Sequence, residues 1–195
     1  KQYAFIINLS ADTHYRLFVN GQWLVEGPQL SDILHWKYET IDIAPYLKTG
    51  KNVIGIEVYN WGYLRHFGMQ SIHTSLIVNG FTDNAQVLNT KGIGDGWKCF
   101  WNTDFHAQEV KWRSAKKDII GGLYANNPTD SVAVNKTPYG WQKEGFNSTD
   151  WSNTVFLEGG ASAGGSFAWL LEPRNVPLQV RSKERLHSIA RSSGV

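Results

Sequence analysis

Alternating side chains that run directly into a turn dipeptide constrain the fold of this chain more than any other feature. Tyr15, Leu17 and Val19 occupy every second position, and a period of two is typical of a β-strand with one face in a core. The dipeptide Asn20-Gly21 follows at once. A tight two-residue hairpin favours this dipeptide because both of its central residues need a positive φ. The sequence therefore predicts a β-hairpin that turns at these two residues.

Further strand signals recur along the chain at short intervals. Residues 5–9 alternate in the same way and are expected to meet the first strand of the hairpin, while residues 53–58 are interpreted as a buried strand. Residues 74–78 run into Asn79-Gly80, which predicts a second hairpin. Short strands separated by turn residues at this spacing predict an all-β fold, arranged as a meander or a jelly roll.

Composition and charge argue against several classes of partner. The 195 residues are enough to bury a core as one domain or as two small ones. Lysine and arginine number 19 and aspartate and glutamate 17, so the net charge of +2 gives no electrostatic reason to expect nucleic acid or a membrane surface as a partner. The chain contains 9 Trp, 8 Tyr and 9 Phe, and such rings both fill a sandwich core and stack on the apolar faces of sugars.

The cysteine content bears on the compartment of the protein, and the two ends of the chain bear on whether it is part of a longer one. Cys99 is the only cysteine, so no internal disulfide is expected. Cysteine usage therefore does not distinguish an oxidising from a reducing compartment. A secreted or periplasmic location is favoured over the cytoplasm. The start at Lys1 and the polar stop at residues 181–195 are interpreted as cuts from a longer protein.

Two blocks of motifs together span most of the chain. The first block consists of Tyr15-Arg16-Leu17-Phe18-Val19-Asn20-Gly21, Gly27-Pro28, Asp32, His35-Trp36-x-Tyr38, Thr40-x-Asp42-x-Ala44-Pro45-Tyr46-Leu47, Gly50-x-Asn52-Val53 and Asn60-Trp61-Gly62. The second block consists of Tyr139-Gly140-Trp141, Gly145-Phe146-Asn147-Ser148-Thr149-Asp150-Trp151 and Trp169-Leu170-Leu171-Glu172-Pro173-Arg174-Asn175-Val176-Pro177. In this order, the two blocks resemble the N-terminal β-sandwich region of bacterial α-L-rhamnosidases. The first block is shared with related sugar-binding sandwiches of other glycosidases, and the second block makes the resemblance more specific.

The resemblance implies a fold and a division into domains. It implies a jelly-roll β-sandwich of the galactose-binding-like kind over residues 1–177, which would form an accessory domain. Residues 178–195 would be a linker toward a catalytic domain, with a short helix where Leu186, Ile189 and Ala190 follow a helical period. The aromatic residues between turn formers in the second block are expected to plug the sandwich. These residues are Tyr139, Trp141, Phe146 and Trp151.

The chain itself is expected to carry no catalytic residues. Glycoside hydrolysis needs two carboxyl groups across the scissile bond, and nothing in the spacing of the available carboxylates selects a pair. The resemblance implies the same, because α-L-rhamnosidases keep their catalytic acids in an (α/α)₆ barrel that would lie beyond Val195. A small self-contained glycosidase stays open as a weaker alternative. The carboxylates considered are Glu26, Asp32, Glu39, Asp42 and Glu57.

The possible metal ligands of this chain are its histidines, its cysteine and the oxygen atoms of its loops. None of the 6 histidines has the spacing of a zinc site, and Cys99 stands alone. We therefore expect no cofactor. Calcium prefers oxygen ligands from loops, and Asp32, Asn60 and backbone carbonyls are able to supply them, so a calcium site stays open.

Two loops combine the side chains that sugar recognition needs. A sugar site offers a ring to stack on an apolar C–H face, a carboxylate or amide to bridge adjacent hydroxyls, and an imidazole or cation to donate a hydrogen bond. The alternative is that Trp36 and Trp61 close the ends of the sandwich, while Asp32 and His35 cap loop backbone. The candidate carbohydrate-binding residues are Asp32, His35, Trp36, Tyr38, Asn60, Trp61 and His66.

The sequence thus predicts a non-catalytic accessory region of an α-L-rhamnosidase-like glycoside hydrolase. Its partners would be a rhamnose-containing glycan and a downstream catalytic domain of the same polypeptide. As a binding module it would hold the glycan near that domain, and as a purely structural interdomain module it would only brace it. Exposed rings beside Asp32 would favour binding, whereas burial of both Trp36 and Trp61 would favour bracing.

Overall fold

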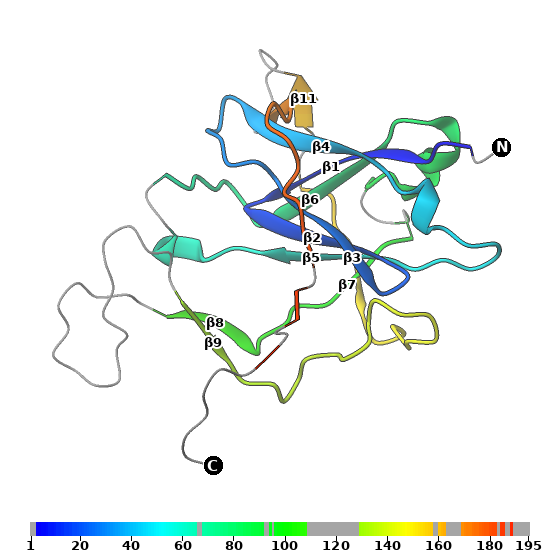
Figure 1. Ribbon diagram of the computed structural model, residues 1–195. Helices are drawn as coiled ribbons and strands as arrows, with labels where there is room; N and C mark the ends of the chain where they lie inside the picture. The colour runs from blue at the N-terminus through cyan, green and yellow to red at the C-terminus, as the bar shows by residue number, and fades with distance from the viewer. Residues whose placement is uncertain are drawn as a thin grey trace, which may run out of the picture.

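The computed structural model describes residues 3–65, 68–91, 94, 96–108, 129–157, 160–162, 169–182, 184–185 and 188. Within these ranges the chain consists of strands and irregular segments, with three short 3-10 helices (Figure 1). The expected all-β, sandwich-like fold is therefore confirmed. Among the residues described, no helix has the length and apolar character that crossing a membrane requires.

The larger of the two main sheets has five strands. Its order is β11-β12-β4-β1-β6, in which β4 and β6 flank β1 in antiparallel fashion and β12 runs parallel to both β4 and β11. The sheet thus joins residues near the start of the chain to residues more than 130 positions later. Its strands are β1 (Ile6–Asp12), β4 (Trp36–Asp42), β6 (Ser75–Gly80), β11 (Gly160–Ser162) and β12 (Trp169–Pro173).

The second main sheet has three antiparallel strands in the order β3-β2-β5, which are β2 (His14–Val19), β3 (Gln22–Gly27) and β5 (Ile54–Tyr59). The turn between β2 and β3 falls at Asn20 and Gly21, whose φ angles are 51° and 82°. This confirms the predicted hairpin and its physical reason, since both turn residues adopt positive φ. The Asn20 side chain also accepts a hydrogen bond from the Val53 amide, which ties the turn to the chain entering β5.

The hydrophobic core is formed by the facing sides of the two sheets. Tyr15, Leu17 and Val19, the alternating residues of the predicted strand, are each at most 1% exposed. Full burial of an aliphatic side chain such as Leu17 or Val19 contributes roughly 1.5–3 kcal/mol. The remaining core residues are Ile7, Leu9, Ala11, Val25, Ile41, Ile43, Val78 and Ala85.

The first strand lies in a different sheet from the one expected. We expected residues 5–9 to meet the strand at 15–19, but β1 pairs with β4 and β6 in the five-stranded sheet. Strand β2 follows after a single residue, Thr13, and belongs to the other sheet. Apolar alternation fixes which face of a strand is buried but not which strand it pairs with, and this explains the difference.

The second predicted hairpin, at Asn79-Gly80, is wrong. Strand β6 continues through both residues, and the 3-10 helix η3 (Asp83–Leu88) follows in place of a returning strand. A Cβ atom at Gly80 would lie 2.2 Å from the backbone carbonyl carbon of Ala85. Glycine is therefore needed here because η3 packs closely on the strand, and not because the chain turns.

Shorter elements surround the sandwich. Two two-stranded sheets pair β7 (Lys98–Cys99) with β10 (Ser152–Asn153), and β8 (Phe105–Gln108) with β9 (Thr129–Val132). In the view of Figure 1, β8 and β9 lie below β2, β3 and β5. The other 3-10 helices are η1 (Ala44–Tyr46) and η2 (Gly62–Leu64).

Aromatic rings of the 139–151 block pack on the three-stranded sheet. The ring centroid of Trp141 lies 5.5 Å from that of Phe18, and Trp151 contacts Trp141 at 6.3 Å. A Cβ atom at Gly55 would lie 2.6 Å from the Trp141 ring, so glycine lets the indole rest on the strand backbone. The rings therefore pack against the sheet from outside. The expected tail helix at Leu186, Ile189 and Ala190 lies outside the described residues.

Candidate functional site

Asp32 and His35 form an exposed pair just before β4. The Nδ1 atom of His35 lies 2.9 and 3.0 Å from the two carboxylate oxygens of Asp32, and the Leu34 amide donates to the same carboxylate at 2.8 Å. The side chains are 53% and 51% exposed. The hydrogen bond from His35, followed by that from Leu34, holds the pKa of Asp32 below its ordinary value. The pair caps its own loop but keeps open surface for a ligand.

Asn60 and Trp61 have partners within the fold. The Asn60 amide donates to the Asp12 carboxylate at 3.2 Å and to Ser71 Oγ at 2.9 Å, and its oxygen accepts from the Gly62 amide. Trp61 is half-buried and meets the Tyr59 ring edge-on at 5.0 Å. Each polar atom of the Asn60 side chain thus has a structural role.

The two candidate loops meet at one segment, residues 70–73. The Ile33 amide donates to Gln70 Oε1 at 3.0 Å on one side, and Asn60 donates to Ser71 on the other. The buried Asp12 carboxylate holds this segment by accepting from the Ile72 and His73 amides at 2.6 and 3.0 Å. The loops are therefore joined through one short bridge at the same end of the sandwich.

Trp36 differs most from its expected role. It is only 6% exposed, so it has no open ring face beside Asp32. It pairs with Leu171 of β12, which covers the edge of β4. Tyr38 is half-buried on the same strand, and His66 lies outside the described residues. Of the seven candidates, only Asp32 and His35 are exposed side chains among those the structure describes.

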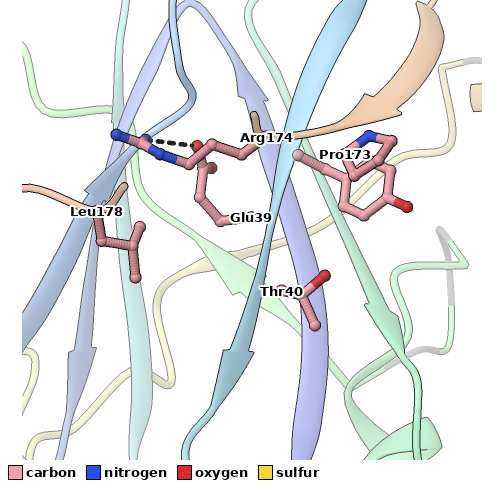
Figure 2. Close-up of a pocket in the computed structure, with 6 residues that line it drawn as sticks. Glu39, Thr40, Pro173, Arg174 and Leu178 are labelled. Atoms are coloured by element: carbon pink, nitrogen blue, oxygen red, sulfur yellow. Dashed lines mark hydrogen bonds and ion pairs between the residues drawn. The ribbon is translucent and has the colours of Figure 1, made fainter. Parts of the chain in front are cut away.

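A buried carboxylate that the sequence did not single out as functional lies on β4, three residues after Trp36. Glu39 is 1% exposed and alternates with the core residue Ile41, so its side chain points into the sandwich. Its Oε1 accepts from Arg174 Nη1 at 3.0 Å and from the Gln29 amide at 2.9 Å, and its Oε2 accepts from the Tyr15 hydroxyl at 2.6 Å. Figure 2 shows the Arg174 guanidinium reaching this carboxylate.

Two neighbours are adapted to this carboxylate. Burial, then the adjacent Glu39 charge and its hydrogen bond, raise the pKa of Tyr15 far above its ordinary value, so the hydroxyl stays protonated and donates. A Cβ atom at Gly27 would lie 2.5 Å from Glu39 Oε2. Glycine at this position therefore leaves the space that the carboxylate occupies.

Arg174 connects this carboxylate to the segment that follows β12. Its Nε donates to the Val176 carbonyl at 2.8 Å, its Nη2 to the Pro177 carbonyl at 2.9 Å, and its amide to the Tyr38 carbonyl at 2.9 Å. The Gln29 side chain also bonds Asn175, at 2.7 Å to its Oδ1 and 3.1 Å from its amide. We call the set Tyr15, Gln29, Glu39 and Arg174 the latch, because it fastens residues 173–177 to the sandwich.

A shallow pocket borders the latch. It has a volume of about 190 Å³ and is lined by Tyr38, Glu39, Thr40, Pro173, Arg174 and Leu178 (Figure 2). Pockets for drug-sized ligands usually enclose about 300–1,000 Å³, so this one is small. The Glu39 and Arg174 charges beside it already neutralise each other. Its geometry suits a connection between segments better than a catalytic cleft.

A second ion pair joins β4 to β12. Lys37 donates to Glu172 Oε2 at 2.7 Å, and the two residues are partners in the parallel register. The Lys37 side chain is 10% exposed and that of Glu172 is 29% exposed. The hydrogen bond from Lys37 lowers the pKa of Glu172, against a smaller opposing effect of desolvation.

The lowered pKa of Glu172 predicts a pH-dependent contribution to stability. Because the folded state holds the carboxylate ionised, the contribution is present above the ordinary glutamate pKa and is lost as pH falls through the lowered one. The free energy of unfolding of the unmodified chain should therefore exceed that of the Glu172→Gln variant at neutral pH. The difference between the two should shrink in acid. Urea unfolding across this pH range tests it, with the exposed Glu184→Gln as the matched control. A pH-independent difference would contradict the role of the charge.

Among the residues that the structure describes, no group of three or more His, Cys, Asp or Glu side chains is placed to hold a metal ion. Asp32 and Asn60, named above as possible calcium ligands, instead bond His35 and Asp12, respectively.

One comparison with known proteins bears on the fold. The chain is similar to a crystal structure of a GH78 family rhamnosidase of Bacillus sp. GL1, with a TM-score of 0.61 and 20% sequence identity. The match covers 90% of this chain and 17% of that chain. No family model and no curated protein sequence matches the chain. At this identity the likeness shows a shared fold.

Proposed function

We propose that this chain is a non-catalytic accessory region of an α-L-rhamnosidase-like glycoside hydrolase, and that it braces the rest of such an enzyme. The observation that carries the proposal is the latch. It holds the backbone that leaves the sandwich at residues 173–177 through a buried ion pair and the carbonyls of Val176 and Pro177. The shared fold and the two motif blocks support the choice of enzyme class, and a jelly-roll connectivity is part of the proposal.

The energetics of the latch favour a positioning role. Burying two charges costs several kcal/mol per ion, and a well-packed apolar pair is often as stable or more so. A buried pair that also bonds the neighbouring backbone fixes one direction and one register for the segment it holds. This suits a module that must present the following segment, in a defined orientation, to a catalytic domain.

A second candidate is recognition of a rhamnose-containing glycan at the loop end. The exposed Asp32–His35 pair favours it, since a carboxylate and an imidazole 2.9 Å apart can bond adjacent hydroxyls. Trp36 is buried, so Trp61 and Tyr38, both half-buried, are the rings that remain. The proposal needs no cofactor; a calcium ion at Asp32 would belong to this second candidate.

The reading frame that encodes this chain and the activity of its product test the bracing role. We expect the frame to continue into a glycoside hydrolase domain, and we expect the isolated chain not to hydrolyse an aryl α-L-rhamnoside. In the complete polypeptide, Arg174→Leu should shorten the half-life of that activity on heating, while the exposed Arg185→Leu should not. Turnover by the isolated chain, a frame without a hydrolase domain, or equal half-lives for the two variants would overturn the proposal.

A further inference from the structure

The outer face of the three-stranded sheet carries a regular arrangement of rings and charges. Cross-strand partners on one face of a sheet are direct neighbours. Arg16 on β2 lies opposite Glu26 on β3 and Glu57 on β5, which makes a charged row across all three strands. Phe18 lies opposite Trp23 on one side of this row, and His14 lies opposite Tyr59 on the other. We call these seven residues the outer-face cluster.

The charged row is partly open to solvent. The Arg16 guanidinium lies 3.3 Å from Glu57 and 3.9 Å from Glu26. The three side chains are between 25% and 37% exposed. The row therefore offers two carboxylates as hydrogen-bond acceptors on either side of one donor, at a surface that a small ligand can approach.

Aromatic faces flank the charged row on both sides. The Arg16 guanidinium lies 5.0 Å from the centroid of the Trp23 ring and 5.2 Å from that of Tyr59. His14 packs on Tyr59 at 4.8 Å, and Trp61 extends this group. Ring faces beside paired carboxylates match the two sides of a pyranose, which has apolar C–H faces and a rim of adjacent hydroxyls.

Two donors in this cluster have no hydrogen-bond partner among the described residues. They are Arg16 Nε and the indole Nε1 of Trp23, both enclosed by surrounding atoms. The nearest carboxylate oxygen to Arg16 Nε, on Glu26, is 3.9 Å away and beyond hydrogen-bond reach. Leaving an enclosed donor without a partner is unfavourable, so such groups call for an explanation. A ligand hydroxyl that accepts from them would provide one.

Arg181, in the segment that follows the latch, lies on the Trp23 ring. The guanidinium carbon of Arg181 is 3.2 Å from the ring centroid. Beyond residue 177, where the latch ends, the segment leading to Arg181 carries the exposed side chains of Leu178 and Val180, so little apolar burial holds it on the sheet. Arg181 therefore covers the aromatic face with a contact that a competing ligand is able to displace.

We propose that the outer-face cluster is a binding site for a neutral pyranose, covered by Arg181 when no sugar is bound. Trp23 stacks on the C–H face of the sugar, Glu26 and Glu57 accept from its hydroxyls, and Arg16 donates to them. With Arg181 displaced, a single arginine lies between two glutamates, which disfavours a phosphate. Among the described residues, no group of three or more His, Cys, Asp or Glu side chains is placed to hold a metal ion, so a neutral ligand fits the site best. This site is separate from the latch and from the Asp32–His35 loop, and it goes beyond the proposed bracing role.

The site is tested by titrating the chain with methyl α-L-rhamnopyranoside and, separately, methyl β-D-galactopyranoside. The indole N–H signal of Trp23 should shift with at least one of them, because an unpartnered donor gains an acceptor. A shallow site with one stacking ring and a few hydrogen bonds gives a Kd on the order of 0.1–10 mM. No shift at Trp23 with either sugar up to about 100 mM would overturn the proposal, as would shifts confined to the Asp32–Tyr38 loop.

Variants separate this site from nonspecific effects. Trp23→Ala should weaken binding at least about tenfold, whereas Arg181→Ala should strengthen it severalfold because the competing contact is gone. Trp101→Ala, which removes an indole that is 86% exposed, should leave binding unchanged. If Trp23→Ala does not fold, Glu57→Gln replaces it and should weaken binding. Unchanged affinity in Glu57→Gln, or weaker binding in Arg181→Ala, would contradict the proposal. Neither result would bear on the latch.

Discussion

Replacing Arg174 with leucine should lower the free energy of unfolding of this chain by about 3–5 kcal/mol, because it leaves the buried Glu39 charge without its partner. The Glu39 side chain is 1% exposed and that of Arg174 is 13% exposed, so solvent cannot take over the role of the guanidinium. The variant also loses the bonds to the Val176 and Pro177 carbonyls. A typical domain is stable by only about 5–15 kcal/mol, so the loss should be conspicuous.

Urea unfolding measures this loss against two controls. Arg185→Leu removes an exposed arginine from the same tail and should change stability by no more than about 0.5 kcal/mol. The double variant Glu39→Gln with Arg174→Leu should be more stable than Arg174→Leu alone, because the unpaired charge is then gone. Equal stability of Arg174→Leu and Arg185→Leu would show that the buried pair does not hold the segment.

Replacing Trp36 with alanine should cost about 3–5 kcal/mol, the usual effect of truncating a buried tryptophan. Trp36 is 6% exposed and stands opposite Leu171, where β12 adds to the edge of the sheet. Its loss therefore weakens the attachment of β12 as well as local packing. The sequence made Trp36 a candidate carbohydrate-binding residue, whereas its burial predicts that its removal mainly lowers stability.

Thermal unfolding of Trp36→Ala and Trp101→Ala tests this prediction with matched substitutions. The Trp101 indole is 86% exposed, so its removal should change stability by no more than about 0.5 kcal/mol. Similar melting temperatures for the two variants would mean that the Trp36 ring is available at the surface. That result would restore Trp36 as a candidate ring for the Asp32–His35 loop.

Local patterns along the sequence predicted the local structure well. The hairpin at Asn20-Gly21 and the core positions of β2 follow from a period of two and a turn dipeptide, which are both short-range signals. The same dipeptide logic failed at Gly80, where glycine is needed for the close approach of Ala85. Glycine permits both a positive φ in a turn and the close approach of another backbone segment, and the dipeptide alone does not tell which of the two applies.

Long-range pairing lay beyond the reach of the sequence. Glu39 and Arg174 are 135 positions apart, and they meet only because β12 adds in parallel to β4. Trp36 stands opposite Leu171 of β12 and is 6% exposed, although the sequence placed it in a loop with the other candidate sugar contacts. The motif block from Trp169 to Pro177 marked this segment in the sequence. It did not identify Glu39 as the partner of Arg174.

Amide hydrogen exchange of β12 and residue 174 tests most directly whether the latch fastens this segment to the sandwich. The Arg174 amide donates to the Tyr38 carbonyl, so it reports on the junction itself. The account predicts slow exchange of the Leu171, Glu172 and residue 174 amides in the unmodified chain, and fast exchange of the same amides in Arg174→Leu while the amides of β1 stay protected. Fast exchange of β12 in the unmodified chain, or unchanged protection in the variant, would contradict it.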